Sequence, residues 1–285
     1  MPRKPNVVVT KSNHLVEATY ALSLAEQRLL LLALARVDSR GPLTVGICHT
    51  ITLADVMEIY GVSRPQAYEL LCQVAQRLYA RSVVIHGPFP HQPDVSLIET
   101  RWVASIRYQD GQGALSIVFA PDILPFLSQL RERFTSYHLK SVASMTSGYA
   151  IRLYELLVQW REAGSRTVEL IWLRERLQLG GKYPNIRDFK NRILNPAIEQ
   201  INAHSDLWVK WEQHKRGRVV HALTFTFGPK ADPKPDTQHP DPAKSKPVKP
   251  KVTRAYIEQH AQPGESWEEA RVRLQGLIDQ GKAPA

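Results

Sequence analysis

Basic and amide side chains recur along one side of a helix that the sequence predicts over residues 184–202. At about 100° per residue, the apolar side of this helix carries Ile186, Phe189, Ile193 and Ala197. The opposite side carries Arg187, Asp188, Asn191, Arg192 and Asn195. Arginine pairs with guanine and asparagine with adenine in the major groove of DNA, so this face has the chemistry of a base-reading helix.

Further polar side chains flank this helix on both sides. Lys182 and Tyr183 lie just before its start, which is a common position for phosphate contact. Lys190 lies nearer the apolar rim, but its long stem can carry the ammonium to a phosphate. A tight turn beyond the helix carries Lys215, Arg216 and Arg218. This turn joins strands predicted over 208–214 and 219–227, and its side chains are candidates for contact with the DNA backbone.

Net charge is concentrated in the same part of the chain. The 285-residue sequence has a formal net charge of +10. Residues 133–229 carry 15 Lys and Arg against 8 Asp and Glu, a net +7, whereas residues 1–132 carry 12 against 11, a net +1. A merely solvated helix face is the alternative interpretation of residues 184–202. The +7 charge and the basic turn favour DNA.

A second helix of this kind is predicted over residues 63–80. Its apolar stripe is Ala67, Leu71, Val74 and Leu78, at spacings of 4, 3 and 4. The candidate DNA contacts outside this stripe are Arg64, Gln66 and Tyr68. Because Glu69 offsets the basic residues and the first 132 residues are near neutral, two interpretations stay open. The helix contacts DNA, or it packs against another subunit.

Both helices precede a hairpin, and the two hairpins end alike. Residues 115–121 read LSIVFAP and residues 223–229 read LTFTFGP, each an alternating strand pattern closed by proline. A helix pair followed by a β-hairpin wing is the order of a winged helix. The sequence therefore predicts an α+β chain with two tandem winged-helix domains, a disordered linker and a short helical C-terminal tail.

Composition and turn signals divide the chain into five parts. We expect a mobile N-terminal tail over residues 1–12 and a first winged-helix domain over 13–132, which dimerises and contacts DNA. The second winged-helix domain, over 133–229, is the main DNA-binding domain. Proline and lysine dominate residues 230–252, which predicts a disordered linker. Residues 253–285 return to helical patterning, which predicts a docking helix or a marginal one.

Caps and periodicity predict the remaining elements. Ser23 and Glu26 form a capping box at the start of a buried, Leu-rich helix over 23–37. The other predicted helices span 52–60, 144–161 and 169–179, and the other predicted strands span 82–86, 95–108 and 114–119. Residues 110–113 predict a hairpin turn. Pro196 predicts a kink or break in the helix over 184–202.

Enzymatic and metal-binding classes find little support in the sequence. Cys48 and Cys72 lie in no metal-ligand pattern, so neither a zinc site nor a disulfide framework is expected. Residues 180–183, GGKY, lack the upstream glycine and following Ser or Thr of a phosphate loop, which argues against ATP binding. The carboxylates show no pairing for general acid–base work. We expect no enzyme activity and no cofactor, and a cytoplasmic protein without a signal peptide or membrane span.

Three separated, ordered blocks resemble a known family. Residues 13–30, NHLVEATYALSLAEQRLL, look like the opening of the replication initiators of iteron plasmids, the winged-helix Rep family that includes the F-plasmid initiator. Residues 151–157, IRLYELL, resemble that family's second-domain helix. Residues 188–198, DFKNRILNPAI, resemble its recognition helix. The resemblance spans roughly residues 6–229.

The resemblance implies two winged-helix domains that bind direct repeats, called iterons, at a plasmid origin as a monomer. It also implies a homodimer, joined through the first domain, that represses the initiator's own gene at an inverted repeat. Host DnaA and the replicative helicase are the implied partners. A tandem winged-helix transcriptional regulator without initiator activity is the alternative. A nicking initiator is disfavoured, because such enzymes hold a metal with a His-x-His pair and this sequence has none.

Overall fold

The computed structural model describes residues 7–89, 92–109, 113–128, 130, 133–230 and 267–279. The chain divides into two compact units, Met1–Lys230 and Ala231–Ala285. Within the described part of the second unit, one helix, α12 (Trp267–Asp279), is present in the predicted helical tail. The predicted linker over 230–252 lies outside the described residues apart from Lys230.

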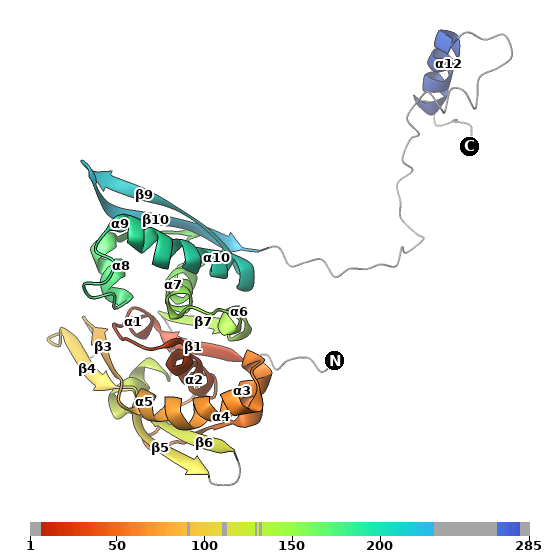
Figure 1. Cartoon of the computed structure of the whole chain (residues 1–285). Helices are drawn as coiled ribbons and strands as arrows, with labels where there is room; N and C mark the ends of the chain where they lie inside the picture. The colour runs from red at the N-terminus through yellow and green to blue at the C-terminus, as the bar shows by residue number, and fades with distance from the viewer. Residues whose placement is uncertain are drawn as a thin grey trace. The chain divides into compact units, whose positions relative to one another are not determined.

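The first unit contains two modules whose elements follow the same order, apart from one additional hairpin and a final 3-10 helix in the first module (Figure 1). The first module contains β1 (Val8–Ser12), α1 (Asn13–Val16), α2 (Leu24–Leu34), β2 (His49–Thr52), α3 (Leu53–Tyr60), α4 (Arg64–Glu69), η1 (Leu70–Val74), α5 (Ala75–Tyr79), β3 (Ser82–His86), β4 (Leu97–Arg101), β5 (Val103–Gln109), β6 (Ala114–Phe119) and η2 (Pro121–Phe126). The second contains β7 (Phe134–His138), α6 (Lys140–Ala143), α7 (Gly148–Val158), β8 (Ser165–Glu169), α8 (Leu170–Arg176), α9 (Ile186–Phe189), η3 (Lys190–Leu194), α10 (Asn195–His204), β9 (Leu207–Arg216) and β10 (Val219–Pro229).

Each module is a winged helix, as predicted. Three-stranded antiparallel sheets with the strand orders β2-β6-β5 and β8-β10-β9 hold the two wings. The third strand of each sheet, β2 or β8, is short and precedes the helix pair. Neither strand was predicted from the sequence. The first module also carries the β3–β4 hairpin between its helix pair and its wing. The α+β class and the two tandem winged helices are confirmed.

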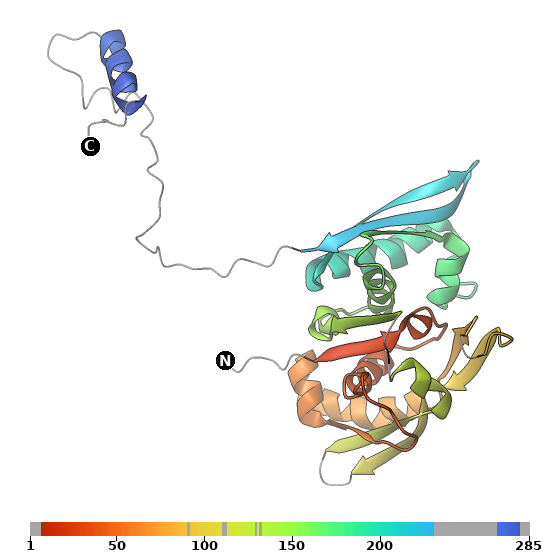
Figure 2. The ribbon, with the colours of Figure 1, turned by 180° about the vertical axis from the view of Figure 1, so that it is seen from behind.

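A strand from each module joins the two modules. β1 pairs antiparallel with β7 in a continuous register from Val8 opposite His138 to Ser12 opposite Phe134. This two-stranded sheet lies between the modules, as both views show (Figure 1; Figure 2). The prediction of a mobile tail over residues 1–12 is therefore wrong for residues 8–12. Residues 1–6 lie outside the described part of the chain.

Capping interactions explain where the helices of the first module begin. Ser23 and Glu26 form the predicted reciprocal box at the start of α2. Thr52 and Asp55 do the same for α3, which ends at Gly61 with a φ of +62°. A positive φ is unstrained for glycine, so the chain turns sharply there into α4. These local contacts account for the success of the sequence-based boundaries.

The helix after each short helix is long and contains a π-helical turn. We call α4-η1-α5 the first reading helix and α9-η3-α10 the second. The π turns, η1 and η3, occupy the middle of both. In the second reading helix, η3 ends directly before Asn195 and Pro196, where the sequence predicts a kink or break. Pro196, which has no N–H to donate, lies in the first turn of α10 directly after this π turn.

One hydrophobic core continues through both modules. Residues 29–34 of α2 are at most 3% exposed, which confirms the predicted burial of this Leu-rich helix on most faces. The predicted strand over 95–108 is instead two strands, β4 and β5, separated by Trp102. The Trp102 side chain is fully buried, so the chain bends there to place it in the core. Residues 110–112 of the predicted hairpin turn lie outside the described residues.

Candidate nucleic-acid interface

The second reading helix separates polar from apolar residues as its periodicity predicts. Phe189, Ile193 and Ala197 are at most 3% exposed and pack in the core. The residues exposed on the other side are Arg187, Asp188, Asn191 and Arg192. Asn195 is only half-buried at the start of α10. The arginine and asparagine side chains are thus presented together on a rigid, anchored helix, which is what base reading in a major groove requires.

The turn before this helix is held by contacts within the second module. Arg174 of α8 donates to the carbonyl oxygen of Lys182 at 2.8 Å, and its guanidinium lies 5.5 Å from the centre of the Phe189 ring. Lys182 is exposed. Tyr183 has a φ of +56° and its ring packs partly against the core. Tyr183 therefore shapes the entry to the helix, and Lys182 is the more accessible of these two predicted contacts.

Lys190 has an intramolecular role that the sequence did not predict. Its ammonium donates to the side-chain oxygen of Gln213 on β9 and lies 5.6 Å from the centre of the Trp211 ring. These contacts tie the second reading helix to the wing. The ammonium is thus already engaged within the module, so its predicted reach to a phosphate requires it to leave or share these partners.

The basic turn of the second wing projects from two long strands. β9 and β10 pair along their length and end at Gly217, whose φ of +63° closes the turn. The predicted phosphate contacts here are Lys215, Arg216 and Arg218, and all three are exposed. Three exposed cationic side chains at a loop tip suit contact with a DNA backbone.

The predicted DNA contacts of the first module are also exposed, but not all of them are available. Arg64, Gln66 and Tyr68 are all exposed, and Tyr68 is 59% exposed. However, the Gln66 side-chain oxygen accepts from the backbone N–H and the hydroxyl of Ser63, each at 3.0 Å. Gln66 is therefore part of the helix cap. The first wing strand, β5, exposes Arg107, a residue that the sequence analysis missed because only the long second-module turn is visibly basic.

A buried charged cluster fixes the two modules to each other. Glu155 of α7 lies 2.6 Å from the ammonium of Lys11 on β1 and 3.2 Å from the guanidinium of Arg152. The hydroxyl of Tyr137 on β7 donates to the same carboxylate at 2.5 Å. Glu155 and Lys11 are each only 1% exposed. Burial tends to raise the pKa of Glu155, but the cations Lys11 and Arg152 outweigh it and hold that pKa below its ordinary value.

A second polar cluster links α8 to the first module. Arg176 donates to the Thr19 hydroxyl and contacts Nε2 of His86, both at 2.7 Å. Burial and the neighbouring Arg176 lower the pKa of His86, so its ring is neutral and its Nε2 accepts. Arg166 pairs with Glu17 at 2.5 Å. Both clusters hold the two reading helices in one arrangement, and neither is visible in sequence because the partners lie far apart along the chain.

Within the described ranges, no group of three His, Cys, Asp or Glu side chains could hold a metal ion. None of the described helices has the length and apolar character needed to cross a membrane.

Two protein-family models match the chain. One, described as "Initiator Replication protein, WH1", matches residues 8–158, and the other, "Initiator Rep protein, WH2", matches residues 169–227. These ranges coincide with the two winged helices and with the β1–β7 sheet and α7 between them.

Relatives and solved structures agree with these matches. A "Replication initiation protein" of Escherichia coli is 26% identical over 226 residues, covering 77% of this chain and 69% of that protein. The "PI protein" of Escherichia coli is 27% identical over 256 residues, covering 76% and 82%. The crystal structure of Pi initiator protein in complex with iteron DNA superposes with a TM-score of 0.69 at 24% identity, over 80% of this chain and 99% of that one. The structural likeness shows a shared fold.

Proposed function

We propose, because the chain belongs to the winged-helix family of initiator replication proteins, that it starts plasmid replication by binding direct repeats in duplex DNA at the origin. The observation that carries this proposal is the match of both family models, one to each winged helix, in a chain whose second reading helix presents exposed arginine and asparagine side chains. The solved complex of the similar Pi initiator with iteron DNA supports a repeat as the target.

The two modules divide the work of binding. The second module supplies most of the affinity, because its exposed reading face and basic wing turn both lie in the part of the chain with a net charge of +7. The first module adds contacts through Arg64 and Tyr68. With two reading helices fixed in one unit, a single chain covers about two turns of the duplex, roughly 20 base pairs.

A dimer of the chain regulates the monomer that starts replication. A homodimer joined through the nearly neutral first module places two second modules on a two-fold symmetric inverted repeat and represses the chain's own gene. Host DnaA and the replicative helicase are the partners for opening the origin. The protein acts in the bacterial cytoplasm on plasmid DNA, as a binding protein without catalytic activity or cofactor.

Footprinting on DNA that flanks the chain's own gene tests this function. The full-length protein should protect direct repeats, and a plasmid that carries those repeats should replicate only when the protein is supplied. Protection of a palindrome alone, with no replication, would instead identify a tandem winged-helix transcriptional regulator.

A further inference from the structure

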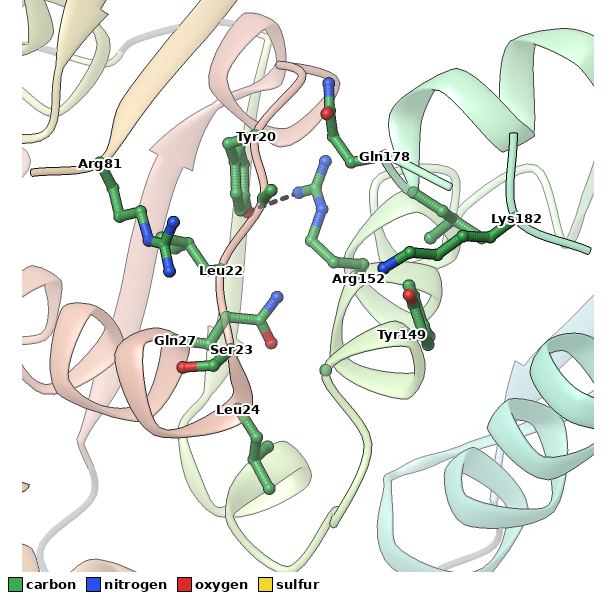
Figure 3. Close-up of a pocket in the computed structure, with 13 residues that line it drawn as sticks. Tyr20, Leu22, Ser23, Leu24, Gln27, Arg81, Tyr149, Arg152, Gln178 and Lys182 are labelled. Carbon is green, nitrogen blue, oxygen red and sulfur yellow. Dashed lines mark hydrogen bonds between the residues drawn. The ribbon is translucent and has the colours of Figure 1, made fainter. Parts of the chain in front are cut away.

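A cavity of about 340 Å³ opens between the two modules (Figure 3). It adjoins one end of each reading helix, because Arg81 follows α5 by two residues and Lys182 precedes α9 by four. Figure 3 shows Arg81 and Gln27 on one side of the cavity and Lys182 and Tyr149 on the other. None of its 13 lining residues is acidic, and three are lysine or arginine.

Two of the three cations have nitrogen atoms without a partner among the described residues. Arg152 is 3% exposed and is paired with Glu155, and its terminal nitrogens also donate to the backbone oxygens of Val16 and Ala18 at 3.0 and 2.8 Å and to the Tyr20 hydroxyl at 2.6 Å. Its Nε is buried and has no acceptor within the described part of the chain. The Lys182 ammonium likewise contacts no described acceptor, because the hydrogen bonds of this residue within the described ranges are made by its backbone N–H and carbonyl oxygen. A buried N–H without an acceptor is unfavourable, so a ligand that accepts hydrogen bonds would stabilise it.

The first turn of α7 adds backbone donors to the same cavity. α7 is 11 residues long, and the side chain of its N-cap residue, Ser147, makes no capping hydrogen bond. Gly148 and Tyr149, the first two residues of the helix, line the cavity. The Gln200 side-chain oxygen accepts from the N–H groups of Thr146 and Ser147, just before the helix. The donors left for the cavity are the N–H groups of Gly148 and Tyr149, which have no partner within the helix and, together with the helix dipole, favour an anion.

Gln27 also faces this turn. Its side-chain oxygen is buried without a partner and lies 3.1 Å from the position that a Cβ on Gly148 would occupy. Because the oxygen and nitrogen of an amide are nearly the same size, turning the amide over would present an N–H donor to the cavity instead. Only the small Gly148 leaves this space open.

We propose that this cavity binds a phosphate group, held by Lys182, Arg152 Nε and the first turn of α7. A phosphate carries several acceptor oxygens and a negative charge, which match this set of donors. The position between the ends of the two reading helices favours a backbone phosphate of bound DNA, at the place where the duplex passes from one module to the other. That assignment of the source rests on the proposed function, whereas the anion site itself does not.

The main test compares three variants of the full-length protein on duplex DNA containing its direct repeat. Lys182→Ala removes one cation, and Ser147→Asp places a carboxylate at the N-terminus of α7. Each should weaken binding by about tenfold. Lys182→Ala should also reduce the slope of log affinity against log salt by about 0.9. Lys140→Ala, an exposed lysine on α6 outside the cavity, is the matched control and should leave the affinity unchanged.

A double variant separates this site from a general charge effect. If Lys182 and the α7 terminus hold the same phosphate, the losses from Lys182→Ala and Ser147→Asp should not add in the double variant. Thermal unfolding checks the fold, because the helix dipole favours a carboxylate at the N-terminus of α7, so the melting temperature of free Ser147→Asp should not fall while its DNA binding does. Fully additive losses, or losses no larger than that of Lys140→Ala, would overturn a DNA phosphate in this cavity.

A second experiment measures the thermal stability of the protein in inorganic phosphate. At constant ionic strength, phosphate in place of chloride should raise the melting temperature of the wild-type protein but not that of Lys182→Ala. A phosphate effect without any loss of DNA affinity would identify a free phosphate as the source. Failure of both experiments would overturn the site. Failure of the wild-type protein to bind repeat DNA would refute the proposed function, and the phosphate experiment would still test the cavity.

Discussion

Glu155→Gln should destabilise the junction between the modules strongly. The Glu155 carboxylate is 1% exposed and lies 2.6 Å from the Lys11 ammonium, which is also 1% exposed. The substitution keeps the size of the side chain and removes its charge. Lys11 is then a buried cation without a counterion, and breaking one partner of such a pair lowers the free energy of unfolding by about 3–5 kcal/mol. For a unit of this size, this corresponds to a fall in melting temperature of roughly 6–20 °C.

Thermal and urea unfolding of the full chain at pH 7 measure this effect. Arg161→Gln is the matched control, because Arg161 pairs with Asp206 where the two side chains are 40% and 44% exposed. Breaking that pair should cost at most about 1 kcal/mol. Adding Lys11→Met to Glu155→Gln should recover much of the loss, because it removes the unpaired ammonium. A Glu155→Gln loss below about 1 kcal/mol, or no recovery with Lys11→Met, would refute the assigned role of the cluster.

Three further predictions concern the reading helices and the same cluster. Arg187→Ala should cost about 1–3 kcal/mol of binding free energy and relax specificity at one base pair. Lys215→Ala should instead weaken binding to all DNA sequences alike. Competition with single-base variants of the repeat distinguishes the two effects. Gln66→Ala should lower the free energy of unfolding by about 0.5–2 kcal/mol through loss of the cap, with Ser63→Ala giving a similar, non-additive loss in urea unfolding. The pKa of Glu155 in the folded protein lies below its ordinary value of 4.5, so the ionised carboxylate stabilises the fold above pH 4.5. This stabilisation is lost as the pH falls through the pKa of the folded state. Glu155→Gln should therefore make the free energy of unfolding less dependent on pH in acid.

Local signals in the sequence were sufficient for much of the fold. The capping boxes at Ser23 and Ser63 and the alternation in the two wings depend on residues within a few positions of each other, so they can be read without tertiary information. The strand over Val8–Ser12 could not be found this way. Its partner, Phe134–His138, lies more than 120 residues away, and its stability comes from that pairing.

The candidate interface was predictable only in part. Exposure of Arg187, Asn191 and Arg192 follows from helical periodicity. Lys190 contacts Gln213 and Gln66 belongs to a helix cap, so each of these two predicted DNA contacts also has an intramolecular role, and only the role of Lys190 depends on tertiary contact. Ser63 and Gln66 have the same spacing as Ser23 and Glu26, so the capping role of Gln66 can be read from the sequence. The cavity between the modules depends on how they pack and had no local signal.

Sedimentation of the full-length protein with its DNA tests the central claim most directly. A single chain that carries two fixed reading helices should occupy each direct repeat of about 20 base pairs alone, and two chains should occupy an inverted repeat. Measurement of the mass of each complex at physiological salt gives both numbers. One chain per direct repeat and two per inverted repeat is the predicted result. Two chains on every site would contradict it and leave an ordinary dimeric repressor.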